Sequence, residues 1–203
     1  MRKPGLQCQR TLVGLLASVA FVVGCAGGGR QAPVAGEPRG LIPDLGGSTV
    51  LLYPVQIRSV IPGEVDVDPE LAFALDGSGS RANWIKPDAL RRRMAQSPGT
   101  ELRVDGLAVE DFLAGEVLRI GDPLFGFIRR AAALDDANYA LIPVAARFRA
   151  ATVESAAGVE VVAALLDAQS GRVVWQATVF GEGALDEPAT LARAAQRLAA
   201  WFR

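Results

Sequence analysis

The chain has 203 residues, half of them hydrophobic, and its 21 basic and 22 acidic side chains give a formal net charge of −1. This length and apolar content suffice for one domain with a full core, and the charge lacks the basic excess typical of nucleic-acid binding. The sequence contains no histidine, which excludes Ser-His-Asp catalysis, Cys-His catalysis and imidazole metal sites.

The N-terminal segment has the features of a bacterial export signal that ends at a lipid-modified cysteine. Three basic residues and no acid precede an apolar run over residues 11–23, which has signal-peptide length and is short for a membrane span. The run closes on Val-Val-Gly before Cys25, and this resembles the bacterial lipoprotein box. We therefore expect residues 1–24 to be a lipoprotein signal peptide and Cys25 to be the acylated N-terminus of the mature chain.

In this reading Cys25 carries a diacylglycerol thioether and a further acyl chain such as palmitate. Each buried methylene contributes about 0.8 kcal/mol, so two or three chains hold a protein on a membrane almost permanently. Ala26 stands where an aspartate is associated with inner-membrane retention, which favours the outer membrane, facing the periplasm. The alternatives are an ordinary signal peptide with an accidental cysteine, or a short uncleaved anchor. Cleavage would remove Cys8 and leave 18 basic against 22 acidic residues.

A Gly- and Pro-rich stretch follows the cysteine. Residues 26–48 (AGGGRQAPVAGEPRGLIPDLGGS) show no apolar periodicity, and a flexible coil of this length has a root-mean-square reach of roughly 25 Å. With the lipidated cysteine they form the predicted tether, residues 25–48. A single globular periplasmic domain is expected at residues 49–203.

The elements of this domain are predicted from hydrophobic periodicity and turn residues. In chain order they are a strand at 49–55, a short helix at 69–75, a helix at 87–96, a strand at 100–105, a helix at 122–134, strands at 139–150, 159–167 and 172–180, and a helix at 186–203. Gly171 stands where the last hairpin needs a left-handed residue, and Pro143 predicts a bulge or an edge position. Residues 106–121 match no pattern. The order predicts an α/β or α+β fold: a mixed central sheet of about five strands, with helices packed on it and a C-terminal amphipathic helix.

The lipid anchor, the tether and two features of the domain resemble a known group of proteins. The features are an early strand ending in YPV and a late hairpin, LLDAQSGRVVW, with Asp167, Gly171 and Trp175 at its turn and second strand. The chain resembles bacterial outer-membrane lipoproteins with a small periplasmic α/β domain: the penicillin-binding-protein activators, the N-terminal domain of TolB and the curli secretion lipoprotein. This resemblance implies a noncatalytic binding or assembly module of the cell envelope. The strands lack the length and alternation of channel-forming hairpins, so no channel is expected.

The sequence offers few residues for catalysis, and we predict no catalytic, cofactor-binding or metal-binding residue. Asp66, Asp68 and Glu70 lie close together in VDVDPE without the spacing of a calcium loop, and we interpret them as a solvated loop. Carboxylates remain the one route to an alternative function, a lipid-anchored hydrolase.

Candidate contacts for a partner lie within the helix predicted at 87–96 and just before it. Arg91, Arg92 and Arg93 would fan over more than half of the helix circumference, either as a solvated face or as a contact for anionic headgroups or an acidic partner. Trp84 follows a polar loop and precedes this helix. We therefore name these four residues as candidate contacts with an envelope protein, besides the membrane contact through the lipid. The sequence leaves the oligomeric state open.

Overall fold

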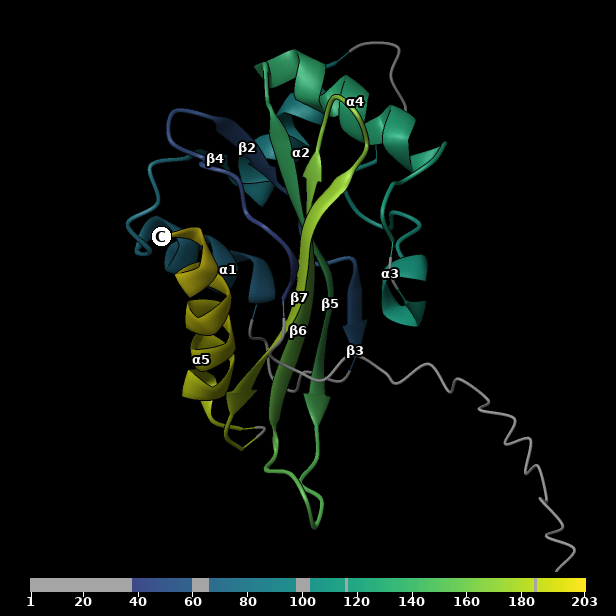
Figure 1. Ribbon diagram of the computed structural model, residues 1–203. Helices are drawn as coiled ribbons and strands as arrows, with labels where there is room; N and C mark the ends of the chain where they lie inside the picture. The colour runs from purple at the N-terminus through teal and green to yellow at the C-terminus, as the bar shows by residue number, and fades with distance from the viewer. Residues whose placement is uncertain (1–37, 60–65, 98–102, 116, 185) are drawn as a thin grey trace, which may run out of the picture. The chain divides into compact units, whose positions relative to one another are not determined.

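Three long antiparallel strands form the centre of the sheet, because three apolar, β-branched runs follow one another in the second half of the chain. In the computed structural model β5 (Tyr139–Arg149), β6 (Gly158–Asp167) and β7 (Val173–Glu182) pair along most of their length (Figure 1). Gly171 closes the turn between β6 and β7 at a φ of +70°, which confirms the left-handed position predicted for it. The structure describes residues 38–59, 66–97, 103–115, 117–184 and 186–203, which all belong to one compact unit of residues 31–203.

Four short strands extend the sheet on both sides of this centre. β2 (Thr49–Leu52) runs parallel to β5 and to β4 (Asn83–Ile85), β3 (Ile57–Ser59) runs parallel to the later part of β5, and β1 (Arg39–Gly40) runs antiparallel to β7. The order β1-β7-β6-β5-β2-β4, with β3 beside β5, makes a mixed seven-stranded sheet. The predicted mixed sheet is confirmed, with more strands than the five expected.

β1 lies inside the stretch that the sequence assigns to the tether. Both of its residues pair with β7, and Leu45, a little further along, is buried in the core. The predicted tether of residues 25–48 therefore overlaps the folded unit, because a two-residue strand and one buried leucine give no periodic signal. The predicted signal peptide and Cys25 lie outside the described residues.

The bulge predicted at Pro143 is present, and it lies in a central strand rather than at an edge. The register between β5 and β6 shifts between Pro143 and Ala145. At this point β5 also changes its other neighbour, from β2 before the proline to β3 after it. Proline has no N–H, so it fits the position where the neighbouring ladder is interrupted, and its carbonyl still accepts from the Gln56 N–H at 3.1 Å.

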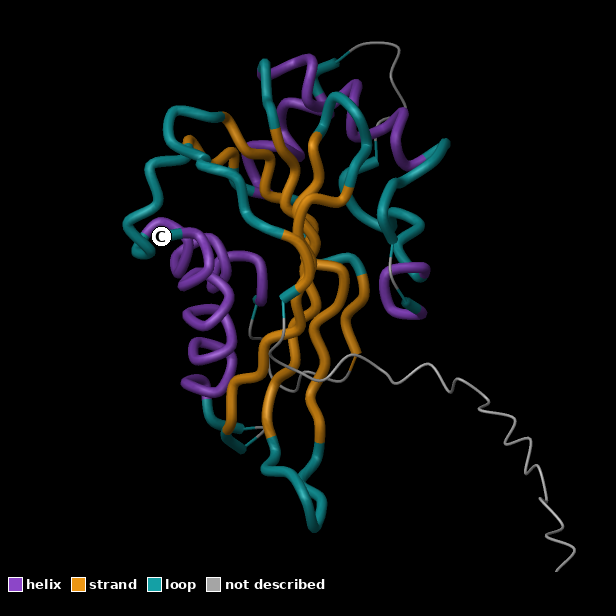
Figure 2. The backbone as a smooth tube through the Cα atoms, in the orientation of Figure 1, coloured by secondary structure: helices purple, strands orange, loops and turns teal. Residues whose placement is uncertain are grey.

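Helices cover both faces of the sheet (Figures 1 and 2). One face is covered by α1 (Val67–Asp76), α5 (Pro188–Ala199) and the 3-10 turn η1 (Ala200–Phe202). The other is covered by α2 (Pro87–Ala95), α3 (Asp111–Ala114) and α4 (Leu124–Asp135). Each large apolar side chain removed from water contributes about 1.5–3 kcal/mol, so the two buried clusters hold this sandwich of layers together.

The structure corrects the predictions for the first half of the chain. Residues 103–105 of the predicted strand 100–105 form no strand, and its first part lies outside the described residues. The segment 106–121, for which no element is predicted, contains α3. α1 is longer than the predicted helix, and α5 starts after Glu187 rather than being capped by Asp186.

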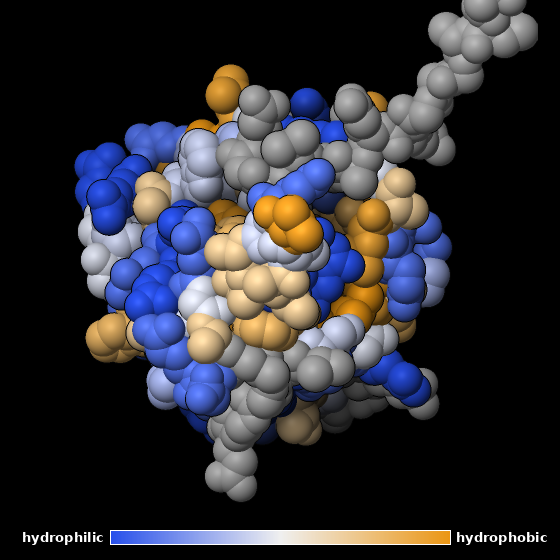
Figure 3. Space-filling model, turned by 90° about the horizontal axis from the view of Figure 1, so that it is seen from below, coloured by the Kyte–Doolittle hydropathy of each residue, from blue (hydrophilic) through white to orange (hydrophobic). Residues whose placement is uncertain are grey.

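The connection between β5 and β6, residues 150–157, forms the end of the sheet opposite to α2 and α4 (Figure 1). Figure 3 looks onto this end, where apolar side chains gather near the centre of the view and hydrophilic ones border them. Residues 151–156 are all exposed.

Candidate functional site

The face of the sheet that carries α2, α3 and α4 is open near the β5–β6 connection. α2 and α4 pack over the opposite end, and the single turn of α3 borders the open part (Figure 1). Because side chains alternate along a strand, every second residue of β5, β6 and β7 faces this open area. The sheet groove, as we name it, has a volume of about 420 Å³ and is lined by Phe112, Leu113, Arg147, Arg149, Glu160, Val162, Gln176 and Thr178.

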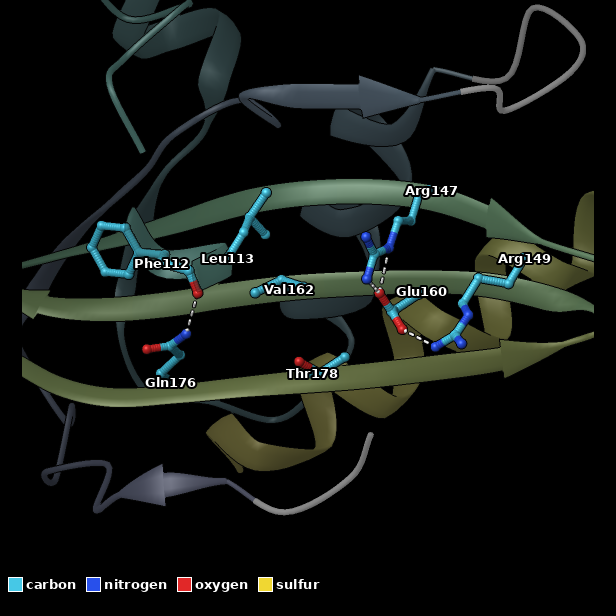
Figure 4. A pocket seen from close by; sticks show the side chains of 8 residues that line it. All are labelled: Phe112, Leu113, Arg147, Arg149, Glu160, Val162, Gln176 and Thr178. Atoms are coloured by element: carbon cyan, nitrogen blue, oxygen red, sulfur yellow. Dashed lines mark hydrogen bonds and ion pairs between the residues drawn. The ribbon is translucent and has the colours of Figure 1, made fainter. Parts of the chain in front are cut away.

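A buried carboxylate between two arginines forms one half of the sheet groove (Figure 4). Glu160 is 2% exposed and lies opposite Arg147 in the β5–β6 register. Its Oε1 accepts from Arg147 Nε at 2.5 Å, and its Oε2 accepts from Arg149 Nη1 at 2.8 Å. A buried carboxylate without partners would be strongly unfavourable, so the arginines make this position tolerable for an acid.

The two arginines remain open to ligands. Their side chains are 49% and 55% exposed, and within the described residues they make no hydrogen bond or ion pair other than those to Glu160. A guanidinium has five N–H donors in a planar fork, so each side chain keeps donors that face solvent. With two positive charges and one negative charge, this half of the groove attracts carboxylates.

The other half of the sheet groove combines hydrogen-bonding and apolar groups. Gln176 Nε2 donates to the Phe112 carbonyl at 2.9 Å, which fixes α3 against β7. Leu113 is 39% exposed at the rim, and Val162 and Thr178 lie between the two halves (Figure 4). The arrangement suits a short peptide segment with an acidic side chain next to an apolar one.

The groove has no constellation for acid–base catalysis. Both carboxylate oxygens of Glu160 accept hydrogen bonds from arginines, and the Thr178 hydroxyl has no general base beside it in the groove. Within the described residues no group of three His, Cys, Asp or Glu side chains could hold a metal ion.

Three of the four predicted partner contacts meet at a second cavity. Trp84, Arg92 and Arg93 line a hollow of about 450 Å³ beside β4, an edge strand. Trp84 packs edge-on against Phe202 at 5.5 Å, and Arg93 pairs with Asp135. Their role as partner contacts stays a prediction.

Arg91 does not line this second cavity. Its guanidinium bonds to Asp68 at 2.9 Å and to Asp105 at 2.7 Å, and it also pairs with Asp88. It joins α2 to α1 and to the segment after residue 102. Arg91 thus links several elements, and its role as a partner contact stays a prediction like that of the other three residues.

The interpretation of Asp66, Asp68 and Glu70 as a solvated loop is wrong. Asp66 caps α1, accepting from the Asp68 N–H, and Asp68 itself is 4% exposed. Asp68 accepts from the Val55 N–H at 2.8 Å and from Arg58 at 2.7 Å, besides Arg91. The acid is buried because three donors converge on it, which spacing along the chain does not reveal.

None of the residues that line the sheet groove is predicted as a site residue from the sequence. The signal of the groove is the placement of polar residues in apolar strands: Arg147 and Arg149 two apart, Glu160 within GVEVVAALL, and Gln176 within VVWQATVF. Two-residue spacing puts Arg147 and Arg149 on one face. The pairing of three strands in register is needed before these residues can be seen to meet.

No helix in the described part of the chain has the length and apolar character needed to span a bilayer. Cys25 lies outside that part, so its lipidation stays a prediction.

No family model matches the chain, and no curated protein matches it. Among solved structures it is similar to the PelC dodecamer from Paraburkholderia phytofirmans, with 16% identity, coverage of 82% of this chain and 94% of that chain, and a TM-score of 0.46. It is also similar to lipoprotein GNA1162 from Neisseria meningitidis, with 12% identity, coverage of 69% and 84%, and a TM-score of 0.41. A hypothetical protein from Chlamydia trachomatis has 14% identity, coverage of 75% and 91%, and a TM-score of 0.37.

Proposed function

We propose that the protein is a lipid-anchored lipoprotein of the outer membrane, held through Cys25 and facing the periplasm, that acts as a noncatalytic binding and assembly module. Its docking surface is the sheet groove, and its ligand is an acidic segment of a protein chain in the envelope. The observation that carries this proposal is the pair of half-exposed arginines fixed by the buried Glu160 on an open sheet face.

The chemistry of the groove supports a peptide ligand. Arginine forks bind carboxylates in two parallel hydrogen bonds, which gives both energy and orientation. Because Arg147 and Arg149 project from a central strand, they are held in place before the ligand arrives. A preorganised site loses less side-chain entropy on binding than one on a loop. The exposed rim of Leu113 adds apolar area next to the charges.

The position of β1 supports the anchor. Cys25 precedes Arg39 by about 14 residues, which reach at most about 50 Å when fully extended. This reach lets a lipidated cysteine lie in a membrane while the folded unit stays in the aqueous phase.

The alternative, a hydrolase using carboxylates, finds no support in the described acids. Asp68 and Glu160 are the two buried acids among them, and each is held by two arginines. Their carboxylate oxygens are taken up by hydrogen bonds from these arginines and, for Asp68, from the Val55 N–H, so they offer no free acid or base to a substrate.

Site-directed photocrosslinking tests the docking surface. The full-length lipoprotein, produced in its own envelope, carries a photoreactive residue in place of Thr178 in the groove or, as a control, in place of the exposed Leu134 on α4. We expect a discrete protein adduct from position 178, none from position 134, and at least about a tenfold loss of adduct with Arg149→Gln. Circular dichroism confirms the fold of each variant. The proposal would be overturned if position 178 gave no adduct, or if the yield of that adduct were the same in the Arg149→Gln variant.

A further inference from the structure

The tip of the β5–β6 hairpin is a preorganised turn. The Thr152 N–H donates to the Ser155 carbonyl at 2.8 Å, and the Thr152 Oγ1 accepts from the Ser155 N–H at 3.1 Å and from the Glu154 N–H at 3.3 Å. The two hydroxyl groups, Thr152 Oγ1 and Ser155 Oγ, lie 2.8 Å apart. These bonds fix the backbone at the tip, so Val153 and Glu154 are presented in one conformation.

The tip exposes an apolar and an acidic side chain next to each other. Val153 is fully exposed, and the Glu154 carboxylate makes no ion pair or hydrogen bond within the described residues. The same end of the molecule shows the central apolar patch of Figure 3. A fixed turn that presents an apolar and an acidic side chain in one conformation loses little entropy when it binds a partner.

The tip complements the sheet groove in charge and in polarity. Glu154 matches the unoccupied donors of Arg147 and Arg149, and Val153 matches the apolar rim at Leu113. The tip does not fill the groove of its own chain, because the Glu154 carboxylate makes no ion pair with Arg147 or Arg149 in the described part of the chain. The groove lies on the strands that the hairpin joins, and the β5–β6 pairing continues as far as Arg149 and Gly158, next to the tip.

We propose that the acidic segment that binds the sheet groove is the β5–β6 hairpin tip of a second copy of this chain. This inference rests on the proposed function and names the ligand of the same groove. Each copy offers one tip and one groove, so two copies can exchange tips reciprocally in a two-fold dimer, or each copy can insert its tip into the next one in a ring or filament.

Charge exchange between tip and groove tests the contact. The full-length lipoprotein in detergent micelles is compared as wild type, as Glu154→Arg, as Arg149→Glu and as the double variant, by sedimentation over a concentration series. We expect wild type to self-associate and each single variant to associate at least about tenfold more weakly, because like charges face each other. The double variant should associate as wild type does, because its tip and its groove have exchanged charges. An equimolar mixture of the two single variants should co-assemble, because the tip of each variant carries a charge opposite to that of the other variant's groove.

Two further variants keep the test independent of folding. Val153→Asp changes a fully exposed side chain at the tip, so it should weaken association without affecting the fold. Leu118→Asp changes a residue that is 77% exposed and lies outside the tip and the groove, so it should leave association as in wild type. Arg149→Gln replaces Arg149→Glu if circular dichroism shows that the second acid beside Glu160 disturbs folding.

The outcomes separate the two proposals. A monomeric wild type, or tip variants that associate like wild type, would overturn the hairpin contact. In that case an Arg149-dependent adduct from position 178 would leave the proposed function standing with another protein as ligand. Loss of both self-association and that adduct would overturn the proposed function as well.

Discussion

Arg91 shows how one side chain can hold several elements at once. Its guanidinium contacts Asp68, which is buried at the start of α1, and Asp105, which follows the end of α2. Asp68 also accepts from Arg58 on β3, so the two arginines share one buried carboxylate. Replacing Arg91 or Asp68 would disturb this junction, and such variants cannot separate a binding role from a folding role.

Asp105 gives a pH-dependent test of the junction. Its pKa is lowered because Arg91 donates hydrogen bonds to both carboxylate oxygens, at 3.1 and 2.7 Å. A lowered pKa in the folded state means that the stabilisation is present above the ordinary value of 3.8 and is lost as pH falls through the folded value. The side chain is 59% exposed, so solvent screening keeps the effect small.

We expect Asp105→Asn to lower the free energy of unfolding by about 0.5–1 kcal/mol at about pH 7, and by progressively less as pH falls toward about 2.5. Urea unfolding at both pH values measures the difference. A cost that does not change with pH would show that the amide disturbs packing rather than the ion pair.

At the scale of elements, the sequence predicts what is long and periodic. The helices α2, α4 and α5 and the strands β5, β6 and β7 repeat their apolar residues over enough positions to be recognised. β1, β3 and β4 have two or three residues each, too few to show alternation, and they exist because β5, β2 and β7 offer open edges to pair with.

The two candidate sites differ in how far the sequence alone can reveal them. Trp84 and the three arginines of α2 stand out as residue types at one place in the sequence, and three of the four do share a cavity. The sheet groove combines residues from α3, β5, β6 and β7, up to 66 positions apart between Phe112 and Thr178, and only strand register brings them together. Register depends on pairing between strands, which the sequence of one strand does not specify.

The seating of α5 on β7 depends on a glycine. A Cβ at Gly181 would lie 2.3 Å from the Thr190 carbonyl oxygen and 2.5 Å from the Ala194 nitrogen, both in the backbone of α5. We expect Gly181→Ala to move the helix and lower the free energy of unfolding by about 1–3 kcal/mol. Urea denaturation measures this change.

Gly121→Ala is the matched control, because nothing lies within 4 Å of a Cβ there and the backbone is not left-handed. It should change stability by less than about 0.5 kcal/mol. Equal effects of the two substitutions would mean that α5 does not approach β7 through Gly181.

At the scale of the whole molecule, the proposed lipid anchor would decide where the groove and the hairpin operate. Cys25 is the cysteine at the predicted cleavage boundary, and Cys8 lies inside the predicted signal. We therefore expect Cys25→Ser to abolish acylation and to move the protein from the detergent phase to the aqueous phase on partitioning. A variant that is cleaved and still enters the detergent phase as strongly as wild type would refute the lipoprotein assignment.

The two-residue pairing of β1 has a mechanical consequence. A pull on the chain from its N-terminal side first reaches the sheet at Arg39 and Gly40, which pair with β7, and the Leu41 N–H donates to the Val174 carbonyl. This two-residue pairing is much shorter than the pairing of the strands behind it, which have ten or eleven residues each, and we expect it to separate first. Detachment of residues 39–44 from the sheet would extend the N-terminal segment by about 20 Å while β5, β6 and β7 stay paired. If Cys25 is lipidated as proposed, β1 would separate first under tension from the anchor and leave the core strands paired.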